Sequence, residues 1–182
     1  MMRMLPMKIS TVIIATCTAL LAGCQAVPAT PVAIVSRVDL SRFMGDWYVI
    51  ASIPTFIETT AFNAVESYGL DADGSIATTF TFLDNGFDGR QKRYHPRGFV
   101  VDRQSNAVWD MQFIWPIKAD YRIAWLAEDY SLVVIAREKR DYAWIMARTP
   151  VISEQQYQER VTFLAAQGYD ITRIRKVPQR WN

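Results

Sequence analysis

Few side chains in this sequence could carry covalent or acid–base chemistry. The chain has two cysteines, Cys17 and Cys24, and one histidine, His95. A thiol can act as a nucleophile, a metal ligand or a site of covalent modification, and a histidine is the usual general base near neutral pH. Cys24 stands out because it directly follows an apolar run and is followed by small residues and prolines, in the stretch LLAGCQAVPATP.

No catalytic arrangement surrounds the single histidine. The sequence has no His/Cys/Glu spacing typical of a metal site, no Gly-x-Ser-x-Gly elbow and no glycine-rich phosphate loop. A serine–histidine–aspartate triad through His95 is conceivable, but no spacing supports it. Because a convergent nucleophile, base and orienting group are missing, the sequence predicts a protein that is not an enzyme and needs no metal or cofactor.

Residues 1–23 have the layout of a secretory signal peptide. Arg3 and Lys8 supply a positive start, and the apolar run behind them is shorter than the roughly 20 residues of a membrane span. An uncleaved short anchor is the alternative. Without these two cations the chain carries 18 basic and 18 acidic residues, so no basic field is present to attract nucleic acid.

The four residues LAGC that end at Cys24 resemble the lipobox of bacterial lipoproteins. This resemblance implies that the sulfur of Cys24 receives a diacylglyceryl group, that the chain is cut before Cys24, and that the new amino terminus is acylated. Two or more acyl chains anchor a protein stably, since each buried methylene contributes about 0.8 kcal/mol. Gln25 resembles the pattern of lipoproteins sent to the outer membrane, with the periplasmic face expected. Ordinary cleavage near Ala26 is the alternative.

Residues 24–37 are predicted to be a short tether, and residues 38–182 a single folded domain. Pro28 and Pro31 stiffen the tether, whose shortness would keep the domain close to the lipid surface. The domain has no cysteine, so no disulfide supports it. Hydrophobic residues make up 51% of the chain, which is ample for a core.

Turn residues at short, regular spacing divide the domain into eight predicted strands. These are residues 48–54, 60–70, 75–83, 91–101, 107–115, 120–127, 130–138 and 141–148. An antiparallel meander of this kind has exposed edges, which closure into a barrel removes. At eight strands the interior is just wide enough to hold one small ligand.

The hydrophobic period changes after the eighth strand. Ser153, with Gln156 three residues later, resembles a capping box, and Tyr157, Val161, Leu164 and Ala165 then recur at helical spacing. Gly168 is typical of a helix C-terminus. The sequence predicts one helix packed outside the sheet and a short terminal strand within 171–177.

Three motifs, in this order, resemble those of the lipocalin family. Gly45-Asp46-Trp47 matches Gly-x-Trp at the start of the first strand. The sequence EDY at 128–130 stands where many members have Thr-Asp-Tyr, so its first residue departs from the pattern. Arg148 ends the eighth strand in DYAWIMARTP, a stretch that with the lipobox is most similar to bacterial and apolipoprotein D-like lipocalins. The resemblance covers about residues 39–177.

The resemblance implies an all-β fold: an eight-stranded antiparallel up-and-down lipocalin barrel with one C-terminal α-helix packed outside. Gly45, Trp47 and Arg148 are expected to close one end of the barrel, as structural rather than ligand-contacting residues. Gly45 would allow a close backbone approach, and Arg148 could stack on the Trp47 indole, worth about 0.5–2 kcal/mol, while donating to nearby carbonyls.

Strand alternation predicts which side chains line the interior and could contact a ligand. They are bulky and mostly aromatic: Phe80, Phe82, Trp109, Met111, Phe113, Tyr121, Ile123, Trp125, Trp144 and Met146. Plain core packing is the alternative reading of each one. As a set they predict an apolar pocket for a long acyl chain, such as a fatty acid or lysophospholipid, carried or stored in the cell envelope.

Two features are predicted to lie at the barrel mouth. Arg90, Lys92, Arg93 and His95 could meet a carboxylate or phosphate headgroup, or could simply be solvated surface charges. The apolar stretches 52–57 and 114–117 would rim the mouth as a lid or a bilayer contact. The alternative function is an envelope structural or docking protein whose apolar mouth binds a partner. The sequence leaves the oligomeric state open.

Overall fold

The computed structural model describes residues 30–181, which include nearly all of a compact unit that begins at Pro31. The predicted signal peptide, the lipid-anchor residue Cys24 and most of the tether lie outside the described residues. Both hydrophobic clusters of the compact unit are built from residues within 32–177.

The described chain is mostly strands, and their bounds are close to the predicted ones. The strands are β1 (Gly45–Ile53), β2 (Ala61–Leu70), β3 (Ser75–Asp84), β4 (Gln91–Tyr94), β5 (Arg97–Val100), β6 (Val108–Ile114), β7 (Ile117–Leu126), β8 (Leu132–Ala136), β9 (Ala143–Ala147) and β10 (Arg175–Lys176). The helices are α1 (Leu40–Phe43), α2 (Glu154–Ala166) and the 3-10 turn η1 (Ile171–Arg173).

The strands form a closed antiparallel barrel, because β1 pairs with both β2 and β9. The predicted fourth strand, 91–101, is split into β4 and β5 around His95 and Pro96, and both halves pair with β3. Proline has no backbone N–H to donate to the ladder, which accounts for the break. Counting β4 and β5 as one, the eight-stranded barrel with a C-terminal helix is confirmed.

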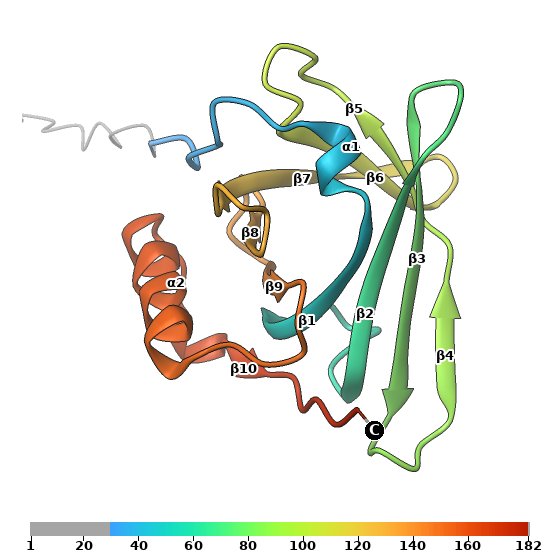
Figure 1. Ribbon diagram of the computed structural model, residues 1–182, viewed down its shortest axis with the longest axis vertical. Helices are drawn as coiled ribbons and strands as arrows, with labels where there is room; N and C mark the ends of the chain where they lie inside the picture. The colour runs from blue at the N-terminus through green and yellow to red at the C-terminus, as the bar shows by residue number, and fades with distance from the viewer. Residues whose placement is uncertain (1–29, 182) are drawn as a thin grey trace, which may run out of the picture. The chain divides into compact units, whose positions relative to one another are not determined.

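The strand directions place alternate loops at the two ends of the barrel. α1 lies across the end where β1 begins, which we call the closed end (Figure 1). Loops 54–60, 85–90, 115–116 and 137–142 lie together at the other end, which we call the mouth. The two predicted apolar loop stretches therefore do share the mouth.

The three sequence motifs meet at the closed end. The guanidinium of Arg148 lies 3.8 Å from the centre of the Trp47 ring and donates to the carbonyls of Arg42, Phe43, Met44 and Asp46. Gly45 has a φ of +93°, and a Cβ there would lie 3.4 Å from a guanidinium nitrogen of Arg148. The backbone therefore requires glycine at this position, and the predicted stacking of Arg148 on Trp47 is present.

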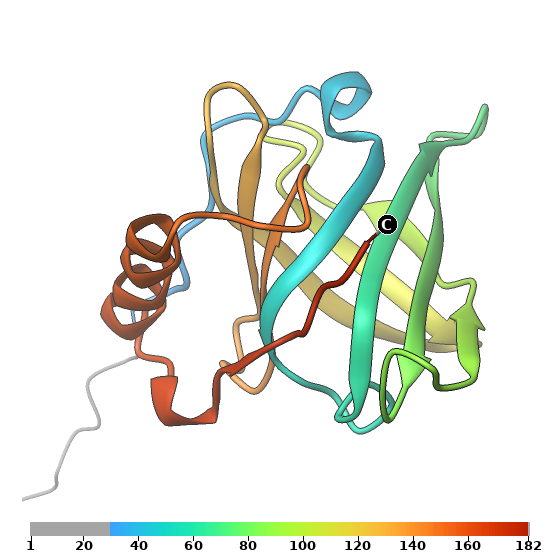
Figure 2. The ribbon, with the colours of Figure 1, turned by 60° about the horizontal axis from the view of Figure 1, so that its bottom comes forward.

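The outside of the barrel carries α2 and the C-terminal segment. Ser153 and Gln156 form the predicted capping box of α2. Leu164 of the predicted stripe is buried and Tyr157 and Val161 are half-buried, whereas Ala165 is exposed. The predicted terminal strand is only the two residues of β10, which pair with β1, and the chain then runs alongside β1 toward β2 (Figure 2).

Candidate functional site

The barrel interior is the candidate site. The half of the interior next to the closed end is filled with aromatic rings. The rings of Phe43, Trp47, Tyr68, Trp109 and Tyr121 touch one another with centroids 5.0–6.4 Å apart. Trp47 and Trp109 have no exposed surface. We call these five rings the aromatic floor. They close the barrel from inside, so a ligand would lie on the side of the floor that faces the mouth.

The interior toward the mouth is also lined by aromatic side chains. Phe80, Phe82 and Tyr94 form a second group of rings there, with centroids 5.3–6.5 Å apart. Tyr94 and Trp144 pack against the interior cluster and are only half-buried. Because these two side chains belong to the inner face and keep accessible surface, they are the interior residues that an apolar ligand entering from the mouth would reach first.

Seven of the ten predicted lining residues belong to the interior cluster, and Trp144 packs against it. The seven are Phe80, Phe82, Trp109, Met111, Tyr121, Ile123 and Met146. Trp109 and Tyr121, however, are stacked on each other in the floor, 5.3 Å apart. Ligand contact by any of these residues stays a prediction.

Trp125 is not in the interior, so its predicted placement is wrong. It packs in the outer cluster beneath α2, with the guanidinium of Arg160 3.6 Å from its ring centre. The register between β7 and β8 shifts between Ile123 and Trp125. A bulge of this kind inserts one extra residue and reverses the faces that follow it, which strict alternation from Ile123 does not anticipate.

Phe113 is also not a buried lining residue. It is 47% exposed and belongs to neither cluster. The register between β6 and β7 shifts between Met111 and Ile114, and β4 pairs only with β3 among the described strands. The end of β6 therefore has no neighbour on that side, and Phe113 joins the exposed residues of the mouth.

Polar groups that the sequence analysis did not single out lie among the interior rings. Glu66 is 9% exposed and Tyr68 is 4% exposed. The Tyr68 hydroxyl donates to the Glu66 carboxylate and lies 2.6 Å from the Tyr121 hydroxyl. Burial raises the pKa of Glu66 to about 7, although the hydrogen bond from Tyr68 opposes the rise, and the charge of Glu58 adds to it.

A second buried carboxylate, Glu58, comes from the mouth loop 54–60. It is 6% exposed and accepts hydrogen bonds from the backbone N–H of Thr55, at 2.8 Å, and from the indole Nε1 of Trp144, at 3.2 Å. Burial raises its pKa also, against the lowering effect of these hydrogen bonds. The inward position of Glu66 could have been predicted from the sequence, because Glu66 shares its strand face with Ala64 and Tyr68. Glu58 lies in a loop, where strand alternation predicts nothing.

The four basic residues near β4 do not form one cluster. Arg90, Arg93 and His95 are exposed, and His95 lies 3.3 Å from the Thr79 hydroxyl. Lys92 alone faces the rings: its Nζ lies 5.9 Å from the centre of the Phe82 ring and 2.8 Å from the Asp84 carboxylate. Of the four, Lys92 alone lies beside an interior ring, and contact with a headgroup stays a prediction.

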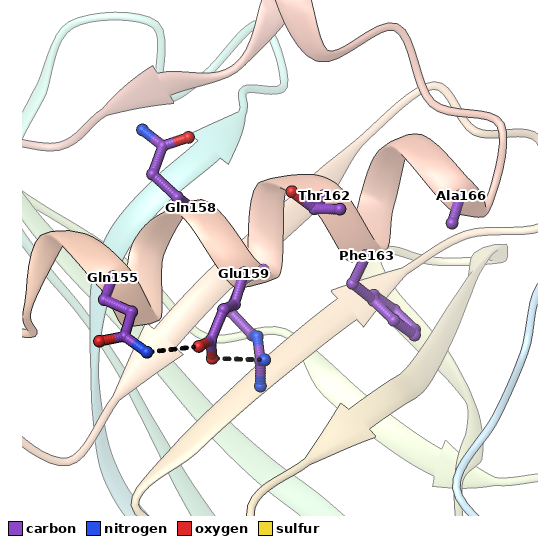
Figure 3. Close-up of a pocket in the computed structure, with 7 residues that line it drawn as sticks. Gln155, Gln158, Glu159, Thr162, Phe163 and Ala166 are labelled. Atoms are coloured by element: carbon purple, nitrogen blue, oxygen red, sulfur yellow. Dashed lines mark hydrogen bonds and ion pairs between the residues drawn. The ribbon is translucent and has the colours of Figure 1, made fainter.

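Elsewhere among the described residues, reactive side chains are not grouped into a second candidate site. A hollow on the outer face of α2 is lined by Gln155, Glu159 and other residues of that one helix, and these two side chains hydrogen-bond each other (Figure 3). Within residues 30–181 no group of three His, Cys, Asp or Glu side chains could hold a metal ion. Over the same residues, no helix has the length and apolar character needed to cross a membrane.

A barrel of eight antiparallel strands, closed at one end and lined inside by apolar side chains, is typical of the class of single-chain barrels that hold small molecules. Residues 38–179 match the family model described as a lipocalin-like domain. The chain therefore belongs to the lipocalin-like family, as the three motifs predict. This membership supports a lipocalin that binds a hydrophobic ligand.

Relatives in bacteria and plants are similar over most of their length. The chain is 26% identical over 182 residues to the outer membrane lipoprotein Blc of Escherichia coli (strain K12), with 98% of each chain covered. It is 30% identical over 161 residues to temperature-induced lipocalin-1 of Arabidopsis thaliana, covering 80% of this chain and 82% of that protein.

Solved structures show the same fold at lower identity. Insecticyanin from the tobacco hornworm Manduca sexta superposes with a TM-score of 0.64 at 15% identity, covering 85% of this chain and 86% of that one. Apocrustacyanin C2 superposes with a TM-score of 0.62 at 12% identity, covering 85% and 94%. At such identities the likeness establishes the barrel alone.

Proposed function

We propose that this protein is a membrane-anchored lipocalin that binds fatty acids or lysophospholipids and carries or stores them in the cell envelope. The observation that carries the proposal is the apolar inner face of the closed barrel, where Phe80, Phe82 and Trp144 lie on the mouth side of the aromatic floor. An acyl chain lying there gains about 0.8 kcal/mol per buried methylene. Its carboxylate or phosphate would point toward Lys92.

The binding test uses protein that begins at Gln25 and therefore lacks Cys24. Fatty acid or lysophospholipid is titrated in while tryptophan fluorescence is followed. A saturable change at micromolar ligand is expected, which corresponds to a binding free energy of about −8 kcal/mol. A folded protein with no response at tens of micromolar would contradict lipid carriage.

The proposed location is the periplasmic face of the outer membrane, through lipid on Cys24. The lipobox-like sequence and the name of the Escherichia coli relative, an outer membrane lipoprotein, support this location. Palmitate labelling should be lost in Cys24→Ser, and globomycin should block processing of the wild-type chain. A Cys24→Ser protein that still fractionates with membranes would rule out the anchor.

We also propose that the mouth faces the lipid. The backbone N–H of Val32 donates to Glu138 in the mouth loop 137–142, at 3.3 Å, so Val32 lies at the mouth end of the barrel. From Cys24 to Val32 an extended chain spans at most roughly 28 Å. Phe56 and Trp115, which are 85% and 82% exposed, lie on mouth loops. The same exposed rim favours, as the second candidate, docking onto a partner protein.

A further inference from the structure

A polar network lies inside the barrel that hydrophobic packing does not require. It links the hydroxyls of Tyr121 and Tyr68 to the carboxylate of Glu66. The strand partners of Glu66 are Trp47 and Phe80, which belong to the interior cluster, so Glu66 points inward with them. Burying a carboxylate among rings costs free energy unless an opposite charge or hydrogen bonds compensate it. The presence of Glu66 inside the barrel therefore needs an explanation.

Compensation within the protein is incomplete. Among residues 30–181 no Lys, Arg or His forms a salt bridge with Glu66 or Glu58. The Tyr68 hydroxyl is the one hydrogen-bond donor to Glu66 in this part of the chain. The second carboxylate oxygen of Glu66 therefore has no hydrogen-bond partner there, but it is not fully buried, because Glu66 keeps 9% of its surface exposed.

The direction of the hydrogen bonds determines what the network can still accept. A phenol has one proton to donate. While Glu66 is ionised it can only accept, so Tyr68 gives its proton to Glu66 and Tyr121 is the donor between the two phenols. In this state the free positions of the network are acceptors: the second oxygen of Glu66 and the lone pairs of Tyr121. Both can take a hydrogen-bond donor from outside the chain, which is either water or a group of the ligand.

We propose that Glu66, Tyr68 and Tyr121 anchor the inner end of a ligand that carries a hydroxyl or primary ammonium group there, with its apolar body against the barrel rings. The inference rests on the proposed function, because it names the ligand chemistry of the same interior. A carboxylate at the inner end would be repelled by Glu66 when Glu66 is ionised. A fatty acid would therefore bind with its carboxylate outward, toward Lys92.

The titratable groups around Glu66 strengthen this selectivity. Tyr68 and Tyr121 face it from β2 and β7, and Glu58 acts on it through its charge from the mouth loop. None of these is a cation, and Lys92 is held by Asp84. Since the pKa of Glu66 is about 7, the carboxylate form grows as the pH rises through neutrality, and with it the attraction for an ammonium group.

The experiment compares dodecylamine, dodecan-1-ol and dodecanoate as probes on protein that begins at Gln25, whose folded unit contains both clusters. Affinities are measured by tryptophan fluorescence for wild type, Glu66→Gln and the surface control Glu128→Gln, which is exposed at the closed end. At about pH 8, wild type and the control should bind the amine and the alcohol about ten-fold more tightly than dodecanoate. Glu66→Gln should lose about ten-fold in amine affinity, with dodecanoate unchanged or tighter.

Each outcome decides the proposal. Equal affinities of wild type for the three probes, or an amine-to-acid ratio that Glu66→Gln leaves unaltered, would overturn the anchor while leaving acyl-chain binding intact. Binding of no probe by folded wild type would overturn the proposed function as well. If Glu66→Gln does not fold, Tyr121→Phe removes one hydroxyl oxygen instead, and it should weaken the alcohol more than dodecanoate.

Discussion

Among single residues, Arg148 joins two segments that are far apart in the sequence. It directly follows β9, stacks on Trp47 of β1 and donates to the carbonyls around α1. A planar guanidinium can stack with its face while donating along its edge, and lysine cannot do both. The arginine is therefore specified by geometry as much as by charge.

We expect Arg148→Lys to lower the free energy of unfolding by about 2–4 kcal/mol, since it removes the stacking and most of the charge-assisted hydrogen bonds. Urea unfolding at neutral pH measures the change. Arg103→Lys, on an exposed loop, is the matched control and should be neutral. A loss for Arg148→Lys no larger than that of the control would contradict this role.

Glu66 makes the stability of the barrel depend on pH. Its pKa rises from an ordinary 4.5 to about 7 on folding, so the folded state holds the proton more tightly than the unfolded chain. The stabilising contribution is complete below pH 4.5 and is lost as the pH rises through about 7. Across that window the free energy of unfolding should fall by on the order of 3 kcal/mol.

Glu66→Gln should remove this fall, because the amide stays neutral at every pH, and the dependence from Glu58, whose pKa is also raised, should remain. Thermal and urea unfolding between the two pH values measure it, with Glu128→Gln as a variant that keeps the wild-type slope. Identical slopes for wild type and Glu66→Gln would show that Glu66 ionises normally in the folded protein.

Among the strands and helices, the bulge in β7 determines on which face of the barrel wall Trp125 lies. Ile123 faces the interior, but Trp125 lies under α2 against Arg160. Trp144 on β9 keeps strict alternation and stays with the interior rings. Two tryptophans that look equivalent in sequence therefore serve opposite faces of the same barrel wall.

This difference predicts two distinct mutant phenotypes. Trp125→Ala should cost about 2–4 kcal/mol of stability by removing a ring that α2 packs on, with acyl-chain affinity unchanged. Trp144→Ala should weaken acyl-chain binding about ten-fold or more, since it removes apolar contact area from the mouth side of the interior. Calorimetric titration measures the affinities and urea unfolding measures the stabilities. If Trp125→Ala reduced the affinity and Trp144→Ala did not, the ligand would not bind in the barrel interior.

Across the whole barrel, Val32 and the apolar rim lie at one end and the three motifs at the other. Val32 meets the mouth loop 137–142, and exposed Phe56 and Trp115 lie on neighbouring loops. The closed end, by contrast, presents the polar turn 71–74. An anchored domain of this shape would approach a bilayer mouth first.

Because residues 25–182 contain no cysteine, single cysteines can report this orientation. Phe56→Cys or Trp115→Cys, carrying an environment-sensitive dye, should shift to the blue on vesicles that contain anionic lipid, since the rim enters the interface. Ala72→Cys, exposed on the turn 71–74 at the closed end, should not shift. Equal shifts at both ends, or none at the rim, would contradict a mouth-first approach.

Much of the barrel could be predicted from sequence because its signals are local. Turn residues mark where strands end, alternation marks their faces, and Ser153 with Gln156 marks the start of α2. Gly45, Trp47 and Arg148 could be recognised because family motifs preserve their order. The predicted inward orientation was wrong at Trp125 and Phe113, where the register shifts, because no local sequence pattern predicts a bulge.

Local patterns in the sequence were sufficient to predict the strand meander, the helix after it and the family. Only the folded chain shows which rings form the aromatic floor and that Glu66, Tyr68 and Tyr121 share one network. The difference lies in distance along the chain. Alternation and capping act over a few residues, whereas β2 meets β7 only when the barrel closes, and only then does a carboxylate lose water and change its pKa.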